Sequence, residues 1–139
     1  MIDIAAILKD HEKTTLEVKK AAGGIPNSLW DTYSAFANTF GGTIILGIEE
    51  DLETKQFIAH GVQDPKKMLS DLWNTLNNSN KVSTNIMLDN HIYTTDYQDM
   101  HFVVLEVPRA DRLDNPVYIG VDPFKGSFRR NHEGDYHYT

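Results

Sequence analysis

Carboxylates gather at two places in this chain, and together they could hold a divalent cation. Glu12 and Glu17 lie before and within one short segment, and Glu49 begins an acidic run with Glu50 and Asp51. Magnesium and manganese take oxygen ligands, and an ion held by convergent carboxylates can activate water for phosphodiester cleavage. These five acids are therefore candidate ligands of such an ion. The competing interpretation pairs Glu17 with a neighbouring lysine and makes the Glu49 run a solvated turn.

Basic residues form a second candidate set. This set comprises nine residues: Lys19, Lys20, Lys66, Lys67, Arg109, Arg112, Lys125, Arg129 and Arg130. All of them except Arg109 and Arg112 are candidate nucleic-acid-binding residues. In residues 124–130 aromatic and basic side chains are interleaved, which suits base stacking combined with phosphate neutralisation, or else a hairpin with solvated arginines. If the nine residues share one side of the fold, they form a nucleic-acid-binding surface.

The loop at residues 21–24 precedes a predicted helix and is either a simple connector or part of an anion pocket. Backbone N–H groups at a glycine-rich helix entrance favour phosphate. The net charge opposes such binding: 13 Lys and Arg against 20 Asp and Glu give −7, and an acidic body repels phosphate unless its basic residues are segregated. We therefore expect weak, steeply salt-dependent binding. No recognition-helix, zinc-finger or aromatic RNA-binding signature predicts base-specific readout.

Length and composition favour one intracellular domain. A chain of 139 residues suits a single core. The absence of cysteine excludes disulfides and thiolate metal sites, and it suits a reducing cytoplasm. Asp3 and Lys9 interrupt the N-terminal segment, which is therefore neither a signal peptide nor a membrane span. We expect a soluble, cytoplasmic protein with no membrane partner.

The elements that must position these residues centre on residues 28–48. Apolar residues at helical spacing predict a helix whose buried face is Leu29, Tyr33, Phe36, Ala37 and Phe40. Ser28 should cap the start of this helix, and Gly41 should end it with a positive φ. Residues 43–48 are apolar and β-branched, which predicts one central strand covered on both faces.

The remaining segments predict a mixed sheet with two principal helices, an α/β (α+β) fold. A short helix is expected at residues 2–8 and a strand at 14–19. Asp64 and Pro65 should begin the second helix, whose apolar face includes Leu72. Residues 82–88, 91–97 and 100–107 read as three antiparallel strands, 116–119 as another strand, and the last eight residues as neither helix nor strand.

The run AFANTFGGTIILGIEED, preceded by LEVKK, resembles the Schlafen-type Alba-like domain, a DNA-binding domain of many bacterial transcriptional regulators that was once described as a divergent AAA-type group. VVLEVP and NPVYI with GSFRR resemble its later strands and closing basic segment, so the resemblance covers roughly residues 12–130. Its structural motif includes Asn38, Gly41, Gly42 and Gly47. The resemblance implies that residues 1–139 are one domain, the N-terminal part of a longer regulator.

The resemblance also sharpens the functional alternatives. In ribonuclease-active Schlafen proteins, acids resembling Glu12, Glu17 and the carboxylate after Gly-Ile, here Glu49 or Glu50, form the cleavage centre. Our first hypothesis is a DNA- or RNA-binding module of a transcriptional regulator without a cofactor. The alternatives are a metal-dependent endoribonuclease that uses magnesium or manganese, and a protein-interaction or dimerisation module, with a homodimer as one form.

Overall fold

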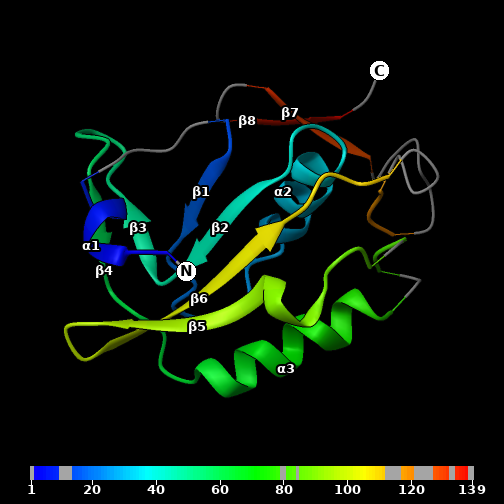
Figure 1. The fold of residues 1–139 in the computed structure, drawn as a ribbon. Helices are drawn as coiled ribbons and strands as arrows, with labels where there is room; N and C mark the ends of the chain where they lie inside the picture. Colours follow the sequence, from blue (N-terminus) through cyan, green and yellow to red (C-terminus); the bar gives the residue numbers. More distant parts are fainter. Residues whose placement is uncertain are drawn as a thin grey trace.

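A four-stranded mixed sheet forms the centre of the computed structural model, which describes residues 2–9, 14–78, 81–83, 85–111, 117–120, 127–131 and 134–137. The strand order is β1-β2-β6-β5 (Figure 1). β2 runs parallel to β1 and antiparallel to β6. The strands are β1 (Leu16–Lys19), β2 (Gly42–Leu46), β5 (Ile92–Tyr97) and β6 (Met100–Val107). The predicted mixed sheet is confirmed, and β2 is central to it as predicted.

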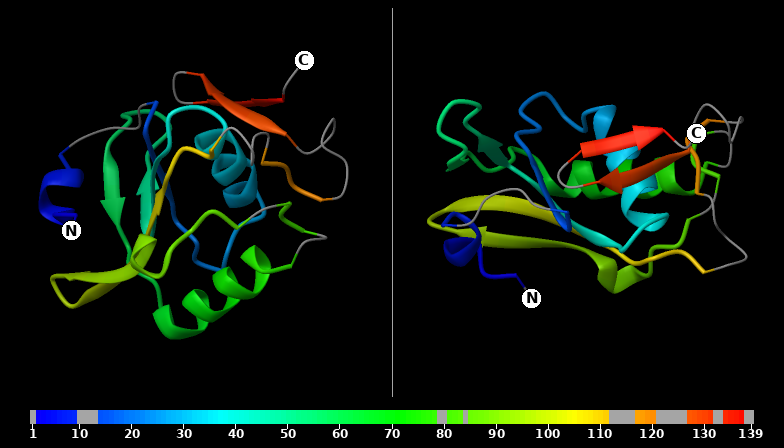
Figure 2. Two further views of the ribbon diagram at one scale, coloured as in Figure 1. Left: turned by 45° about the vertical axis from the view of Figure 1, so that its right-hand side comes forward. Right: turned by 90° about the horizontal axis from the view of Figure 1, so that it is seen from above.

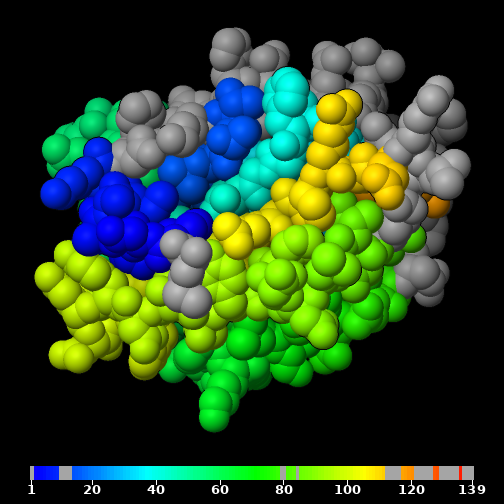
Figure 3. Space-filling model, in the orientation of Figure 1, coloured from blue at the N-terminus to red at the C-terminus, as the bar shows by residue number. Residues whose placement is uncertain are grey.

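Helices cover both faces of this sheet unequally (Figure 2). α2 (Ser28–Ala37) and α3 (Pro65–Leu76) pack on one face, where alternate residues of β2 and β6 such as Ile44 and Leu105 join their core. The short α1 (Ile4–Ile7) lies on the other face, where Ile45 belongs to a second core. Figure 3 shows α1 against the hairpin of β5 and β6. Alternation along the strands thus gives each face its own core.

α2 begins and ends differently from the prediction. Its N-cap residue is Asn27, without a side-chain cap hydrogen bond, and Ser28 is already helical, so the predicted Ser28 cap is wrong. The helix ends at Ala37, and Gly41, with φ +73°, donates its N–H to Phe36 O at 2.7 Å. The predicted positive φ is confirmed. Phe40 lies in the turn before Gly41 and is 67% exposed, so its predicted burial is wrong.

Gly47 divides the predicted central strand into two. Its φ is +111°, and the chain leaves β2 to form β3 (Ile48–Glu50), which pairs antiparallel with β4 (Phe57–Ala59) in a separate ribbon. The single strand predicted for residues 43–48 is therefore wrong at this residue. Because glycine adopts a positive φ without a Cβ clash, the apolar run can change direction here.

α3 and the β5–β6 hairpin agree with their predictions. Asp64 caps α3 by accepting the backbone N–H of Lys67 at 3.1 Å, and Leu72 is fully buried. Gln98 and Asp99 join the two strands with φ +50° and +64°, as a two-residue hairpin turn requires. Residues 82–88 are not the predicted third strand: among the described residues only Val82 pairs there, through an isolated bridge to Ile119.

The C-terminal segment forms a hairpin, which the sequence analysis gave as one alternative for residues 124–130. Its second strand lies within the last eight residues, where neither helix nor strand was predicted, so that prediction is wrong. β7 (Phe128–Asn131) pairs antiparallel with β8 (Gly134–His137), and both contact α2. Among residues 117–120, the predicted strand is reduced to isolated bridges at Tyr118 and Ile119. Gly134 and Asp135 have low strand propensity, so tertiary contacts with α2 rather than local preference select β8. α3, with 12 residues, is the longest described helix, and no helix in the described ranges could cross a membrane.

Candidate nucleic-acid interface

The two candidate catalytic acids that the structure describes, Glu17 and Glu49, have different partners. Glu12 lies outside the described residues. Glu17 lies in β1, and its Oε1 is 3.7 Å from Lys19 Nζ, with both side chains less than 15% exposed. Glu49 lies in β3 and hydrogen-bonds His60 Nε2 at 2.7 Å. Because residues two apart share one face of a strand, the Glu17–Lys19 pair follows from the β1 geometry.

The rest of the acidic run contributes to a turn. Asp51 accepts hydrogen bonds from the backbone N–H groups of Glu53 at 2.8 Å and Thr54 at 3.1 Å. These N–H groups, that of Thr54 foremost, hold the pKa of Asp51 below its usual value because they stabilise the ionised carboxylate. Within the described ranges, no three His, Cys, Asp or Glu residues are arranged to hold a metal. The candidate catalytic set of Glu12, Glu17 and Glu49 stays a prediction.

His60 is a partner that the sequence analysis missed. β3 and β4 pair so that Glu49 stands opposite Ile58, and His60 comes two residues later at the end of β4. The Glu49 and His60 side chains are 41% and 37% exposed. The register of the β3–β4 hairpin could have identified this pair, because it places Glu49 near the residues that end β4 and follow it.

Three lysines meet around one groove on the helical face. Lys19 Nζ donates a hydrogen bond to Ser28 Oγ at 3.2 Å, which links the end of β1 to the start of α2. Ser28 lines a groove of about 710 Å³ together with Lys67 and Lys81. We call it the α2–α3 groove; its other walls include Gly24, Trp30, Asp71 and Gly120. A second hollow of about 280 Å³ shares Gly24, Lys67 and Asp71 with it.

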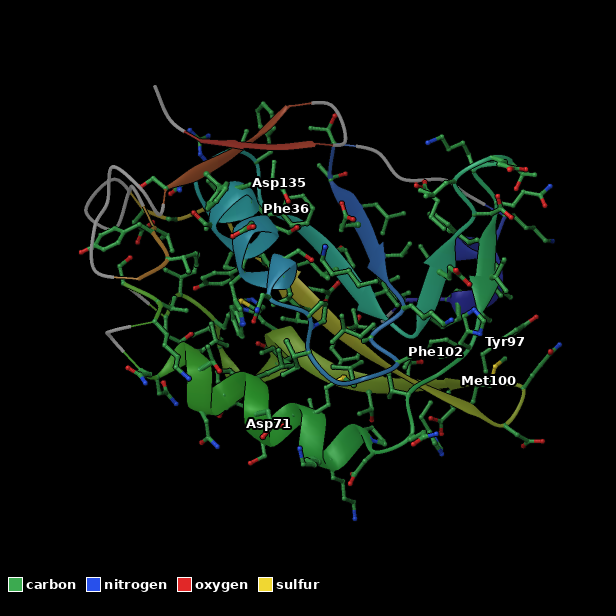
Figure 4. The ribbon with its side chains drawn as sticks, turned by 180° about the vertical axis from the view of Figure 1, so that it is seen from behind. Phe36, Asp71, Tyr97, Met100, Phe102 and Asp135 are labelled. Carbon is green, nitrogen blue, oxygen red and sulfur yellow. The ribbon has the colours of Figure 1, made fainter. Side chains whose placement is uncertain are left out.

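The charges along this groove are mixed. Lys67 Nζ lies 3.1 Å from Asp71 Oδ2, one turn further along α3, and this exposed pair is a weak one because water screens it. Asp31 also lines the groove. Lys81 has no ion pair among the residues that the structure describes. An incoming phosphate could bind Lys81 directly and would compete with Asp71 for Lys67. Figure 4 views this helical face, with Asp71 labelled on α3.

Lys81 was absent from the predicted basic set, because it is an isolated lysine with no local pattern around it. Its backbone carbonyl accepts the N–H of Gly120 at 2.8 Å, and Val82 bridges to Ile119. These contacts bring residue 81 and residues 119–120 together at the groove. Only the tertiary structure could therefore have identified this lysine.

The other predicted basic residues do not all join the groove. Lys20 and Lys66 are exposed near it, after β1 and in the first turn of α3, but neither lines it. Arg109 lines a different hollow of about 360 Å³, beside Leu88. Arg112 and Lys125 lie outside the described residues. Arg129 and Arg130 belong to β7, but only their backbone is described.

The loop at residues 21–24 lies at the α2–α3 groove, as the anion-pocket hypothesis requires. Gly24 has φ +113°, and no neighbouring atom lies within 4 Å of the position that its Cβ would take. Asn27 makes no side-chain hydrogen bond to the first turn of α2. The open backbone at the loop would let a ligand approach closely, which is compatible with both interpretations given by the sequence.

Known proteins share this fold. No curated protein matches the chain. The solution NMR structure of the N-terminal domain of a "Putative ATP-dependent DNA Helicase RecG-related Protein" from Nitrosomonas europaea is 21% identical with a TM-score of 0.70, and the match covers 94% of this chain and 89% of that one. The crystal structure of the DIP2311 protein from Corynebacterium diphtheriae is 17% identical with a TM-score of 0.59; the match covers 90% of this chain but only 25% of that one.

The family comparison covers the same part of the sequence as the resemblance described above. Residues 12–139 match the family described as "Schlafen, AlbA_2", and this range includes β1, both principal helices and every strand of the sheet. The chain therefore belongs to the Schlafen AlbA_2 family.

Proposed function

We propose that this chain is a nucleic-acid-binding module whose contact surface comprises the α2–α3 groove and β7. One observation carries the proposal: Lys67 and Lys81 line a single groove, and Lys19 is hydrogen-bonded to Ser28 in its wall. The name of the Nitrosomonas europaea protein, which refers to a DNA helicase, supports nucleic acid as the ligand class. Basic side chains from two separate segments, Lys67 of α3 and Lys81, would thereby contact the same phosphate backbone.

The groove is better suited to a single strand or a splayed end than to specific readout of a duplex. Its walls combine ammonium groups with apolar surface from Ile25 and Ile119, so phosphates and base faces could both find partners. No described helix projects as an isolated recognition element, because α2 and α3 both pack on the sheet. Contacts of this kind favour sequence-tolerant binding.

The longer context is also a proposal. We place the module in a transcriptional regulator that acts on DNA, as the family resemblance implies. The match to the Corynebacterium diphtheriae protein covers a quarter of that chain, which supports the use of this fold as one module of a larger protein. Cytoplasmic location and dimerisation stay predictions.

The first prediction concerns the lysines of the groove. Lys67→Gln combined with Lys81→Gln should weaken binding to oligothymidylate and to unrelated single strands alike, because the two ammonium groups neutralise phosphates. The slope of log K against log salt should become shallower by about 0.7 for each phosphate that is no longer neutralised. Fluorescence anisotropy over a salt series measures both quantities.

The control for this variant is Lys9→Gln combined with Lys55→Gln, which removes the same two charges from exposed positions that do not line the groove. It should leave the slope unchanged. If the control and the groove variant weaken binding equally, net charge rather than the groove explains the affinity. A wild-type chain that binds no nucleic acid even at low salt would reject the proposed function itself.

The nuclease alternative leads to a separate prediction. We expect no efficient metal-dependent cleavage, because Glu17 already has Lys19 as a counter-charge and Glu49 is hydrogen-bonded to His60. These carboxylates therefore need no shared cation to offset mutual repulsion. Wild-type protein would be incubated with structured RNA or single-stranded DNA and with magnesium or manganese. Cleavage that Glu12→Ala and Glu17→Ala both abolish would contradict this expectation and favour the endoribonuclease.

A further inference from the structure

Two buried polar side chains near the C-terminal end of α2, those of Ser34 and of the C-cap residue Asn38, hold the C-terminal part of the chain. They lie one helical turn apart, and they are 0% and 8% exposed. Their partners are the backbones of Val117 and Phe128, 79 to 94 residues further along the sequence. We call these two side chains the Ser34–Asn38 cluster. It uses the Asn of the AFANTFGG run, for which the sequence alone gave no chemistry.

The hydrogen bonds of the cluster form a closed network. Asn38 Oδ1 accepts the N–H of Val117 at 2.6 Å. Asn38 Nδ2 donates to Val117 O at 2.8 Å and to Phe128 O at 2.9 Å. Ser34 Oγ donates to Val117 O and accepts the N–H of Phe128 at 3.0 Å. Since a buried amide or hydroxyl that loses its partner is costly, the network fixes these two backbone positions.

Each fixed position leads directly to one part of the proposed contact surface. Val117 precedes Ile119 and Gly120, which line the α2–α3 groove opposite Lys67. Phe128 begins β7, the strand that carries Arg129 and Arg130. The network therefore determines both the position of a groove wall and the position of the basic strand on α2.

A second contact attaches the other strand of the C-terminal hairpin. Thr32 Oγ1, two residues before Ser34, donates to Asp135 Oδ2 of β8 at 2.6 Å. Figure 4 shows the hairpin lying across α2 with Asp135 beside the helix. Polar side chains of α2 thus help to hold the hairpin, together with the buried Phe128, whereas the sheet core depends on apolar packing such as that of Leu105. Loss of the cluster can loosen the hairpin without unfolding the sheet.

We propose that Ser34 and Asn38 are positioning residues for nucleic-acid binding, because they hold the groove wall and β7 in place on α2. This inference rests on the proposed function. The two residues touch no nucleic acid themselves, since they are buried under the segments that they hold. Their removal acts through Arg129, Arg130 and the groove wall, so its effect on binding must resemble that of removing the two arginines.

Asn38→Ala in the full 139-residue chain is the test. Hydrogen exchange followed by NMR should show reduced protection at the Val117 and Phe128 amides, while the amides of β2 and β6 keep theirs. Binding to oligothymidylate should weaken, and the salt slope should become shallower by about 0.7 for each arginine that no longer reaches a phosphate. A variant that merely folds less completely would lose the same factor of affinity at every salt concentration and would keep the wild-type slope.

Three further variants make the outcome decisive. Ser34→Ala removes the acceptor for the Phe128 N–H and serves if Asn38→Ala does not fold. Arg129→Ala with Arg130→Ala should reproduce the shallower slope without altering exchange at Val117. Val104→Ala, in the core on the opposite face, lowers the denaturation midpoint without touching the cluster and should keep the wild-type slope.

Each failure has its own meaning. If Phe128 loses protection but the salt slope stays at the wild-type value, the positioning role is wrong and the proposed function stands. If Phe128 stays protected in both cluster variants, the network does not hold β7 and the inference is also wrong. If the wild-type chain shows no binding, the proposed function and the inference that rests on it both fail.

Discussion

Gly41→Ala should lower the free energy of unfolding by about 2–5 kcal/mol, one of the largest effects expected of a single substitution in this fold. Gly41 has φ +73°, and a residue with a Cβ pays about 1–2 kcal/mol there. The added Cβ would also lie 2.7 Å from Val107 O and 3.1 Å from Arg109 N. Both are backbone atoms at the end of β6, so relief requires the sheet and the turn to move apart. Urea denaturation measures the change.

Gly120→Ala is the matched control for this prediction. Gly120 has a similar φ of +80°, but no atom lies within 4 Å of its Cβ position. It should therefore show the conformational cost alone, about 1–2 kcal/mol. Equal losses for the two variants would mean that the contact with β6 contributes nothing. A loss below about 1 kcal/mol at Gly41 would contradict the assigned turn geometry.

The end of α2 shows which structural features local sequence patterns can predict and which they cannot. The sequence predicted the turn at Gly41, because a glycine pair after an amphipathic run is a local signal. It placed Phe40 in the core, because the 3.6-residue period continues to that position. In the structure Asn38 is the C-cap residue, and its side chain bonds Val117, 79 residues away. Helical periodicity does not reveal such a tertiary contact. The prediction therefore extended the helix to Phe40, whereas the helix in the structure ends at Ala37.

The errors in the predicted strands also arise from tertiary contacts that local sequence patterns do not reveal. β5 and β6 form a local hairpin, and their alternation and two-residue turn were sufficient to predict it. β8 contains Gly134 and Asp135, which disfavour strands, and it forms where α2 supplies a partner for Asp135 through Thr32. Residues 82–88 are apolar enough for a strand, yet only Val82 finds a pairing partner among the described residues.

The candidate site was predictable only where its residues carry local signals. Lys67 is identifiable from the sequence because it lies in the first turn of a predicted helix, where the helix dipole disfavours cations, and Lys19 because it lies in a predicted strand. Lys81 had no such signal, and the folding of residues 119–120 beside it brought it to the groove. The acids were predicted as one cluster from their residue types, with a pair between Glu17 and a neighbouring lysine as the alternative. That pair needs only the alternation of side chains along β1, whereas the partner of Glu49 depends on the register of β3 and β4. Lys19 is the partner of Glu17, and His60 is the partner of Glu49.

The second glycine of the pair gives the other large prediction. Gly42→Ala should lower the free energy of unfolding by about 1–3 kcal/mol, although its φ is outside the left-handed region. The added Cβ would lie 2.8 Å from three ring atoms of Phe36, a fully buried residue of α2. The cost is therefore one of packing between β2 and α2, and a smaller side chain at position 36 should relieve it.

Phe36→Leu tests this assignment. The double variant Gly42→Ala with Phe36→Leu should be more stable than the sum of the two single changes predicts, by about 0.5–3 kcal/mol, because the smaller side chain makes room for the new methyl group.

Phe102→Leu is the control partner. Phe102 packs in the core on the opposite face of the sheet, and Gly42 pairs with Val107, five residues further along β6. The separation is roughly 16 Å at the usual rise of a strand. The control pair should add within about 0.5 kcal/mol, as distant sites do. Denaturation measurements on the two single variants and the double variant complete the cycle for Gly42→Ala and Phe36→Leu. If their effects on stability simply add, the Phe36 ring does not limit the space at Gly42, and the backbone requires the second glycine instead.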